Sequence, residues 1–180
     1  PGGVMTPGGT WTVGADAQGR FCIFRPDGTH LNGATYGGPG DPLYVSALGD
    51  GDVLCLPQNG GRKVSHLSGY APLELNVYGA SSYAMRAVLM SDFETYLRGI
   101  AEVSGSWPQE AVKAQAVAAR SYAVSSMGKH ASSGYDICDE THCQYYQGYE
   151  KEKDAGWVQA VEATAGQVLT YAGSVAHCFY

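Results

Sequence analysis

An alanine-rich stretch over residues 107–127 constrains the fold of this chain more than any other segment. It contains no glycine, and Pro108 stands where the first turn of a helix tolerates it. Because alanine has the highest helix propensity, the stretch predicts a helix of roughly 30 Å at about 1.5 Å per residue. Ser106 and Gln109 have the spacing of a capping box at its start, and Gly128 is a natural stop at its end.

The first half of the chain has a different character. Short apolar or alternating stretches are separated by Gly, Asp, Pro and Asn, a pattern typical of strands and turns. Over residues 73–78 apolar and polar side chains alternate, as in a strand with one face in water. From Ser91 the pattern becomes helical, with Ser91 as N-cap and Glu94 reaching back to it. The sequence therefore predicts an α+β fold, in which a β-rich N-terminal part packs with a helix-centred part.

Shorter elements follow from the same signals. The glycine-rich stretch 33–42 is expected to be a mobile loop, and tight turns are expected at 27–28 and 59–60. Residues 129–154 include a long polar loop whose aromatic and cysteine content favours an ordered, functional segment. Strands are expected at 10–13, 20–25, 44–48, 53–56, 73–78 and 83–89, helices at 92–101 and 154–164, and a hairpin over 167–180.

The low charge of the chain excludes two classes of partner. Only 16% of the residues are charged, and a net charge of −6 leaves no broad basic surface for nucleic acid or an anionic membrane. No apolar run approaches the roughly 20 residues that span a bilayer, so no transmembrane segment is expected. The 25 glycines and 13 tyrosines are typical of a secreted protein, and we expect any export signal to have been removed already.

Five cysteines stand at positions 22, 55, 138, 143 and 178. In an oxidising compartment an odd number leaves at least one cysteine unpaired within the chain. A bridge between Cys22 and Cys55 is expected in the β-rich part. Cys178 would then be the odd thiol.

The cysteines of the long loop allow two interpretations. Cys138 and Cys143 flank His142, and two thiolates with an imidazole are good zinc ligands. Their spacing is looser than a Cys-x2-Cys knuckle, and no fourth ligand is obvious, with His130 as the nearest candidate. A disulfide between Cys138 and Cys143 is the preferred interpretation in an extracellular setting, and zinc is the alternative.

Four ordered segments, 96–102, 107–123, 135–144 and 164–171, resemble the signature of the SpoIID/LytB domain family. The first three read Tyr-Leu-Arg-Gly-Ile-Ala-Glu, Trp-Pro-Gln-Glu-Ala-Val-Lys-Ala-Gln-Ala-Val-Ala-Ala-Arg-Ser-Tyr-Ala and Tyr-Asp-Ile-Cys-Asp-Glu-Thr-His-Cys-Gln. The resemblance covers 83–180 as a SpoIID-like core and leaves 1–82 as a β-rich N-terminal region. Family members generally continue with a Ser- and Gly-rich segment, so we expect the core to be truncated at its C-terminal end.

The resemblance implies work on the bacterial cell wall. The sporulation members are lytic transglycosylases that cleave peptidoglycan between N-acetylmuramic acid and N-acetylglucosamine, and the LytB members are described as amidase enhancers. We therefore expect a secreted or cell-surface protein of the bacterial envelope that binds peptidoglycan glycan strands. The alternative is a non-catalytic wall-binding or amidase-activating module, part of a surface assembly, with a cell-wall amidase as its partner.

The family's catalytic glutamate follows the Tyr-Leu-Arg-Gly segment, and this places it at Glu102. Many members carry Ser-Glu-Met-Pro there, whereas this chain has the more compact Ala101-Glu102-Val103-Ser104. A lytic transglycosylase needs one carboxylic acid that protonates the glycosidic oxygen and then takes the proton of the muramic 6-hydroxyl. Unlike ordinary glycosidases it needs no second carboxylate, and no cofactor is required.

Other side chains are candidates for contacts with sugar hydroxyls and acetamido groups. Gln115 and Tyr122 fall along one stripe of the long helix, with Arg120 beside it. The competing interpretation is that these residues only fix the helix to the sheet. Aromatic and amide side chains in the loop suit sugar faces as well. The expected substrate-binding residues are Arg98, Gln115, Arg120, Tyr122, Gln144 and Tyr145.

Overall fold

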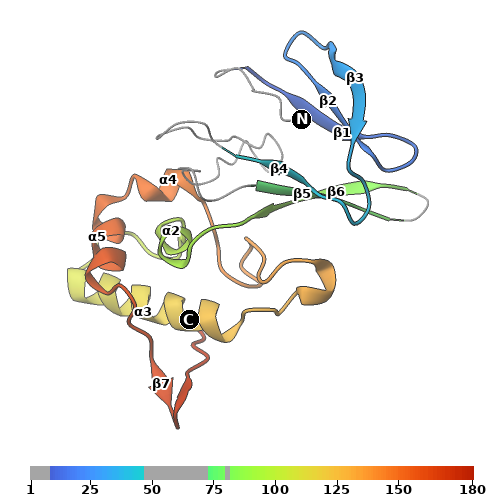
Figure 1. Cartoon of the computed structure of the whole chain (residues 1–180). Helices are drawn as coiled ribbons and strands as arrows, with labels where there is room; N and C mark the ends of the chain where they lie inside the picture. Colours follow the sequence, from blue (N-terminus) through green and yellow to red (C-terminus); the bar gives the residue numbers. More distant parts are fainter. Residues whose placement is uncertain (1–8, 47–72, 80–81) are drawn as a thin grey trace. The chain divides into compact units, whose positions relative to one another are not determined.

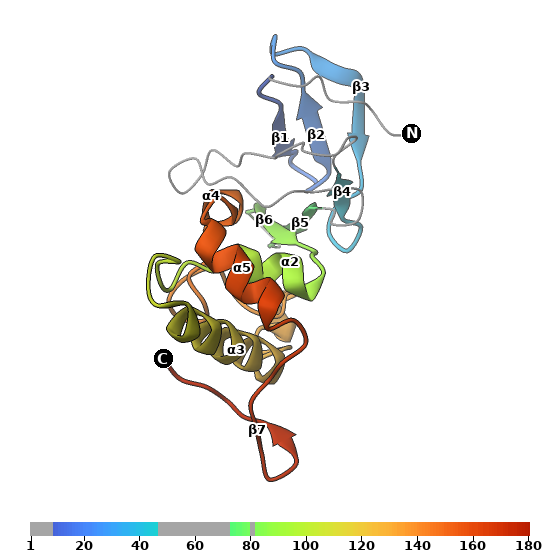
Figure 2. The same ribbon diagram turned by 90° about the vertical axis from the view of Figure 1, so that its left-hand side faces the viewer.

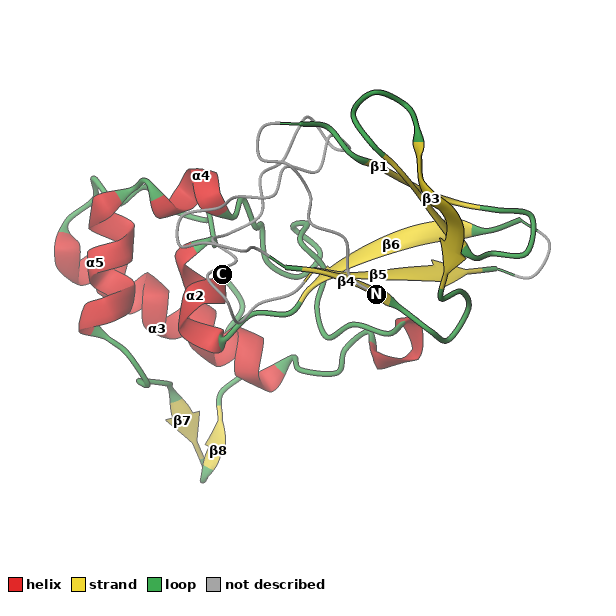
Figure 3. Cartoon of the chain, turned by 45° about the horizontal axis from the view of Figure 1, so that its top comes forward, coloured by secondary structure: helices red, strands yellow, loops and turns green. Residues whose placement is uncertain are grey.

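The computed structural model describes residues 9–46, 73–79 and 82–180. These residues form two compact units, the first containing 9–46, 73–79 and 82–90 and the second containing 91–180. The first unit is built from strands, and all the described helices lie in the second (Figure 3). The predicted α+β class is therefore confirmed.

The first unit consists of two antiparallel three-stranded sheets (Figure 1). Its strands are β1 (Thr12–Ala15), β2 (Phe21–Phe24), β3 (His30–Tyr36), β4 (Leu43–Val45), β5 (Leu73–Tyr78) and β6 (Ala84–Leu89). One sheet has the order β1-β2-β3 and the other the order β4-β5-β6. Along β5, Leu73, Leu75 and Val77 are buried, which confirms the alternation predicted for residues 73–78.

The stretch 33–42, predicted as a mobile loop, contains part of β3. The pairing of β3 with β2 shifts in register, and Asn32 and Gly33 have φ values of 56° and 59°. Residues with positive φ are typical of β-bulges, so this glycine marks an irregularity inside a strand. The turn predicted at 27–28 is confirmed between β2 and β3. The strand predicted at 53–56 and the turn at 59–60 lie outside the described residues.

The second unit has a helical core. Its elements are α2 (Phe93–Arg98), α3 (Gln109–Ser125), the 3-10 helix η1 (Ala131–Ser133), α4 (Tyr149–Glu152), α5 (Ala155–Ala163) and the hairpin of β7 (Thr170–Tyr171) and β8 (Ser174–Val175). The alanine-rich stretch forms α3, as predicted, and α5 packs against both α3 and α2 (Figure 2). Trp157 of α5 is fully buried, and its Nε1 donates to the carbonyl of Leu97 at 3.0 Å. No helix within the described ranges is both long and apolar enough to cross a membrane.

The ends of α2 and α3 differ from the predicted caps. Asp92, and not Ser91, is the N-cap of α2, because its carboxylate accepts the backbone N–H three residues later. Pro108 occupies the N-cap position of α3 without a side-chain cap, and the Oγ of Ser106 lies 2.8 Å from that of Ser104 instead. Adjacent polar residues can each cap a helix, and the turn that precedes the helix decides between them.

Arg120 of α3 joins the helices of the second unit. Its side chain is 2% exposed, and its five N–H groups all donate hydrogen bonds. Two go to the carboxylate of Glu94 in α2, at 3.0 and 2.7 Å. The others go to the carbonyls of Val161 and Gln167 and to the hydroxyl of Thr164, at 3.2, 3.1 and 3.4 Å. Since all five donors are engaged inside the unit, the geometry favours the interpretation that Arg120 fixes the helix, and its contact with substrate stays a prediction.

The carboxylate of Glu94 compensates the buried charge of Arg120. Burial on its own would raise the pKa of Glu94, but the hydrogen bonds from Arg120 and from the N–H of Gly166 outweigh it. The pKa of Glu94 therefore lies below its usual range. A folded-state pKa that is lowered contributes stability above the unfolded-state pKa, and this contribution is lost as the carboxylate becomes protonated.

We expect Glu94→Gln to destabilise the second unit by about 3 kcal/mol at neutral pH, because it leaves a buried guanidinium without its counter-ion. Urea unfolding over a pH series from 7 downward measures this effect, and the difference from the unmodified protein should shrink as the pH falls through the lowered pKa of Glu94 and the carboxylate becomes protonated. The matched control is Glu162→Gln, which removes an exposed ion pair with Arg98 and should cost at most about 0.5 kcal/mol. Equal losses in the two variants would contradict this role of Glu94.

Candidate functional site

Glu102 lies where the chain leaves a short antiparallel pairing inside the second unit. Ile100 pairs with Tyr146, and the N–H of Ala101 donates to the carbonyl of Tyr145 at 2.9 Å. At the next residue the side chain, and not the backbone, is the acceptor: Oε1 of Glu102 accepts the N–H of Tyr145 at 2.7 Å. The half-buried carboxylate is thereby fixed against the loop that carries the cysteines.

Gln144 anchors this loop to the core. It is fully buried, and its Nε2 donates to the carbonyl of Ala119 in α3 at 3.1 Å and to Oη of Tyr180 at 2.6 Å. Its Oε1 accepts the hydroxyl of Tyr96 in α2 at 3.0 Å, and the ring of Tyr96 stacks on Tyr146. The amide of Gln144 is thus directed into the core, and its contact with substrate stays a prediction. Its side chain holds the backbone that presents the N–H of Tyr145 to Glu102.

Aromatic residues of the C-terminal segment lie close to this arrangement. Tyr180 packs edge-on against Tyr122, with ring centroids 6.3 Å apart, and His177 lies 5.1 Å from Tyr122. Tyr180 is 52% exposed, although its hydroxyl accepts a hydrogen bond from the buried Gln144. Burial raises the pKa of Tyr180 to about 12, and the nearby negative charge of Glu102 adds to the rise. Glu102 therefore has a partly exposed aromatic ring within electrostatic range.

The loop after Glu102 is held by a partly buried ion pair. Lys151 of α4 is 8% exposed at its side chain, and its ammonium contacts the carbonyl of Val103 and, at 2.8 Å, the carboxylate of Asp154. Asp154 accepts the N–H of Gly105 at 2.8 Å and caps α5. A Cβ on Gly105 would collide with Asp154, and one on Gly156 would collide with the carbonyl of Gly105. The loop is thus closely packed on the start of α5.

The structure also locates the other predicted substrate-binding residues. Arg98 forms an ion pair with Glu162 at 3.1 Å, which directs it toward α5. Tyr122 is buried, with its hydroxyl 3.2 Å from Nζ of Lys129. Tyr145 is half-buried beside Glu102, and its hydroxyl accepts a hydrogen bond from the side chain of the nearby Gln147. In the described part of the chain, the amide nitrogen of Gln115 is buried without a hydrogen-bond partner.

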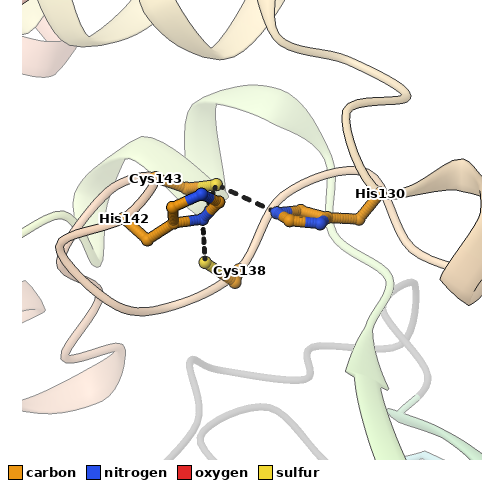
Figure 4. Close-up of side chains that lie close together, drawn as sticks. All are labelled: His130, Cys138, His142 and Cys143. Atoms are coloured by element: carbon orange, nitrogen blue, oxygen red, sulfur yellow. Dashed lines mark hydrogen bonds between the residues drawn. The ribbon is translucent and has the colours of Figure 1, made fainter.

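His130, Cys138, His142 and Cys143 form a compact cluster (Figure 4). Their ligand atoms all lie within 4.8 Å of one another. Nδ1 of His142 is 3.6 Å from each sulfur, and Nε2 of His130 is 3.4 Å from the sulfur of Cys143. Zinc bonds of about 2.0–2.3 Å at tetrahedral angles place ligand atoms about 3.3–3.8 Å apart. The donor set therefore fits a zinc ion, and the three distances given above lie in this range.

The preferred disulfide does not form in this structure, because Cys138 and Cys143 are both free thiols. The fourth side chain of the cluster is His130, which precedes η1. Burial on its own would raise the pKa of Cys143, but hydrogen bonds from Cys138 and from the ammonium of Lys129 lower it. Burial and the neighbouring Cys143 raise the pKa of Cys138, so only one of the two sulfurs becomes a better metal ligand in this way. Cys22 is also a free thiol, and its predicted partner Cys55 lies outside the described residues.

Several residues of the site were not predicted as functional. Tyr96 lies in the segment that resembles the family, but nothing in the local sequence predicts that its hydroxyl contacts Gln144. Tyr180 and Lys129 have no motif of their own, and only the fold brings them to Tyr122. A shallow hollow of about 420 Å³ lies between α3 and the end of α5, and none of the predicted site residues lines it.

Comparisons with known proteins place this site in a family context. The SpoIID family, described as Stage II sporulation protein, matches residues 81–171. The chain is 30% identical over 158 residues to a protein of Brachyspira hyodysenteriae (strain ATCC 49526 / WA1) described as uncharacterized, covering 76% of this chain and 42% of that protein. It is 40% identical over 79 residues to the amidase enhancer of Bacillus subtilis (strain 168), covering 44% of this chain and 10% of that protein. The chain thus spans less than half the length of these relatives, and no solved structure matches it.

Because Gly105 has no room for a Cβ, we expect Gly105→Ala to destabilise the second unit by about 2 kcal/mol. Chemical denaturation measures the loss. Ser106→Ala is the control at the neighbouring, exposed position and should stay within about 0.5 kcal/mol. A Gly105→Ala protein as stable as this control would show that the loop after Glu102 is free to move.

Proposed function

The chain belongs to the SpoIID family, and on this premise we propose that it is a peptidoglycan lytic transglycosylase with Glu102 as its acid and base. The substrate is the glycan strand, cleaved between N-acetylmuramic acid and N-acetylglucosamine with formation of a 1,6-anhydro ring. The observation that carries the proposal is the hydrogen bond of 2.7 Å from the N–H of Tyr145 to the carboxylate of Glu102. It fixes one oxygen of the residue at which the family resemblance places the catalytic group.

The proposed reaction needs one carboxyl group in two protonation states. Protonated Glu102 gives its proton to the glycosidic oxygen as the bond to the anomeric carbon breaks. The resulting carboxylate then takes the proton of the muramic 6-hydroxyl, whose oxygen bonds to the anomeric carbon and closes the ring. Because Oε1 is occupied by Tyr145, we assign proton transfer to Oε2. Each step leaves Glu102 in the state that the next step requires.

Exposed aromatic rings support a saccharide as the ligand. Tyr180 is 52% exposed and Phe179 is 84% exposed, and aromatic faces suit the apolar faces of sugar rings. We assign Tyr145 and Tyr180 to glycan contacts beside Glu102. With a net charge of −6, hydrogen bonds and stacking serve recognition better than attraction to an anionic polymer. We further propose that the protein acts outside the cell, at the bacterial envelope.

The second candidate function is activation of a cell-wall amidase without glycan cleavage. The observation that favours it is the identity of 40% to a relative named amidase enhancer. In that case Glu102 and the aromatic rings would serve binding. The two functions differ in whether a covalent bond of the glycan is broken, and product analysis separates them.

We also propose that His130, Cys138, His142 and Cys143 hold a structural zinc ion. Four protein ligands leave no open coordination position, which is typical of structural sites. The ion would supply folding energy by joining the segment before η1 to the loop that follows it. Lys129 also holds the loop in place, because its ammonium donates to the carbonyl of His142 at 3.0 Å.

Glu102→Gln should reduce glycan cleavage about 100-fold or more, since general acid catalysis contributes about 10²–10⁴ to a rate. The assay is mass spectrometry of products from purified glycan strands, intact and stripped of stem peptides, with 1,6-anhydro-muramic ends as the readout. Glu110→Gln, an exposed glutamate of α3, is the control and should keep full activity. Binding without anhydro products from the unmodified protein, together with stimulation of a cell-wall amidase, would favour the second function.

The zinc proposal predicts one zinc per chain by elemental analysis and native mass spectrometry. Free zinc at about 1,000 times its Kd should stabilise the protein by about 4 kcal/mol in thermal unfolding, and a chelator should reverse the effect. Cys143→Ser should abolish binding, whereas Cys22→Ser in the first unit should not change it. A disulfide between Cys138 and Cys143 in metal-free native material would contradict the proposal.

A further inference from the structure

We propose that the segment 143–145 couples the metal cluster to Glu102, with Gln144 as the positioning residue. The inference rests on the proposed function for the role of Glu102, and on the proposed zinc site. Three consecutive residues have three different tasks. Cys143 belongs to the cluster, Gln144 is anchored in the core, and Tyr145 presents its N–H to the carboxylate.

The segment is short enough to transmit a displacement. Two planar peptide units separate Cys143 from Tyr145, so their Cα atoms are at most about 7 Å apart. The turn before the segment is closed by the N–H of Cys143, which donates to the carbonyl of Glu140 at 2.9 Å. The pairing after it is closed by the carbonyl of Tyr145, which accepts the N–H of Ala101. A change in the backbone dihedral angles of Cys143 therefore changes the direction in which the N–H of Tyr145 points.

Gln144 restricts this segment to one orientation. Its amide makes three hydrogen bonds, two as donor and one as acceptor, and the residue is fully buried. Turning the segment would leave these groups unpaired in the core, where unpaired polar groups are costly. The structure holds the segment in one arrangement, and any other position of Tyr145 would break these hydrogen bonds. Tyr96 donates a hydrogen bond to the amide oxygen.

A bound metal ion would fix Cys143 and so favour the arrangement in which Tyr145 meets Glu102. Coupling between two sites is reciprocal for binding free energies. The carboxylate of Glu102 must therefore strengthen metal binding by the same factor by which the metal favours the contact with Tyr145. This consequence is measurable without any glycan, which separates it from the proposed catalysis.

The first experiment measures zinc affinity by competition with a chromogenic chelator, using the full chain and no substrate. Glu102→Ala should bind zinc about fivefold more weakly, the lower end of typical coupling. Glu102→Gln keeps an oxygen that accepts the N–H of Tyr145 and should retain most of the affinity. Glu110→Ala is the control and should match the unmodified protein. Equal affinities for all four proteins, or no zinc binding by the unmodified protein, would overturn the coupling.

The second experiment tests the positioning role through Tyr96→Phe, which removes one hydroxyl from Gln144 and leaves the aromatic stacking. We expect a several-fold lower kcat for glycan cleavage with little change in KM, and a similar loss of zinc affinity. Tyr171→Phe, at an 81% exposed tyrosine of β7, is the control. A lower melting temperature with unchanged kcat, KM and zinc affinity would assign Tyr96 and Gln144 to stability alone and overturn the proposal. If Glu102→Ala weakens zinc binding but the unmodified protein cleaves no glycan, the proposed transglycosylase activity is rejected and the coupling between the metal cluster and Glu102 is retained.

Discussion

The guanidinium of Arg120 is the interaction on which the second unit depends. Its donors reach Glu94 in α2, Val161 in α5 and the segment that follows α5, so one side chain fixes the mutual arrangement of three helices. A buried cation is stable only when its charge is compensated and its donors are satisfied. The surroundings of Arg120 meet both conditions. Gln144, which orients the backbone beside Glu102, is anchored to Ala119 of α3 and to Tyr96 of α2, two helices that Arg120 joins.

Local patterns predicted the elements whose signal is strong within a few residues. The alanine-rich stretch became α3, and the alternation over 73–78 became β5, because propensity and burial agree there. The strand β3 was missed, since Asn32 and Gly33 look like a loop although they lie inside the strand, where its pairing with β2 shifts in register. The N-cap of α2 was predicted wrongly because two neighbouring polar residues, Ser91 and Asp92, can each cap a helix.

In the candidate site, too, local sequence patterns identified some residues, whereas their burial depended on the fold. The family motif pointed to Glu102. The loop sequence pointed to Cys138, His142 and Cys143 as possible metal ligands, with His130 as the nearest candidate for a fourth. Burial is set by contacts far apart in the chain, so the sequence could not show that Gln144 and Arg120 lie inside the core. Both are polar residues that on the surface would suit a sugar. In the interior they use the same hydrogen-bonding groups to hold the protein together.

The pairing of β6 has a consequence for dissecting this protein. The family match begins at residue 81, whereas β6 belongs to the first unit, where it is hydrogen-bonded along its whole length to β5. A fragment cut at the start of the match would carry β6 without its partner strand. It would expose unpaired backbone groups and apolar side chains such as Val88 and Leu89, which are the features of an aggregation-prone edge. Cutting after residue 90 would avoid this orphaned strand.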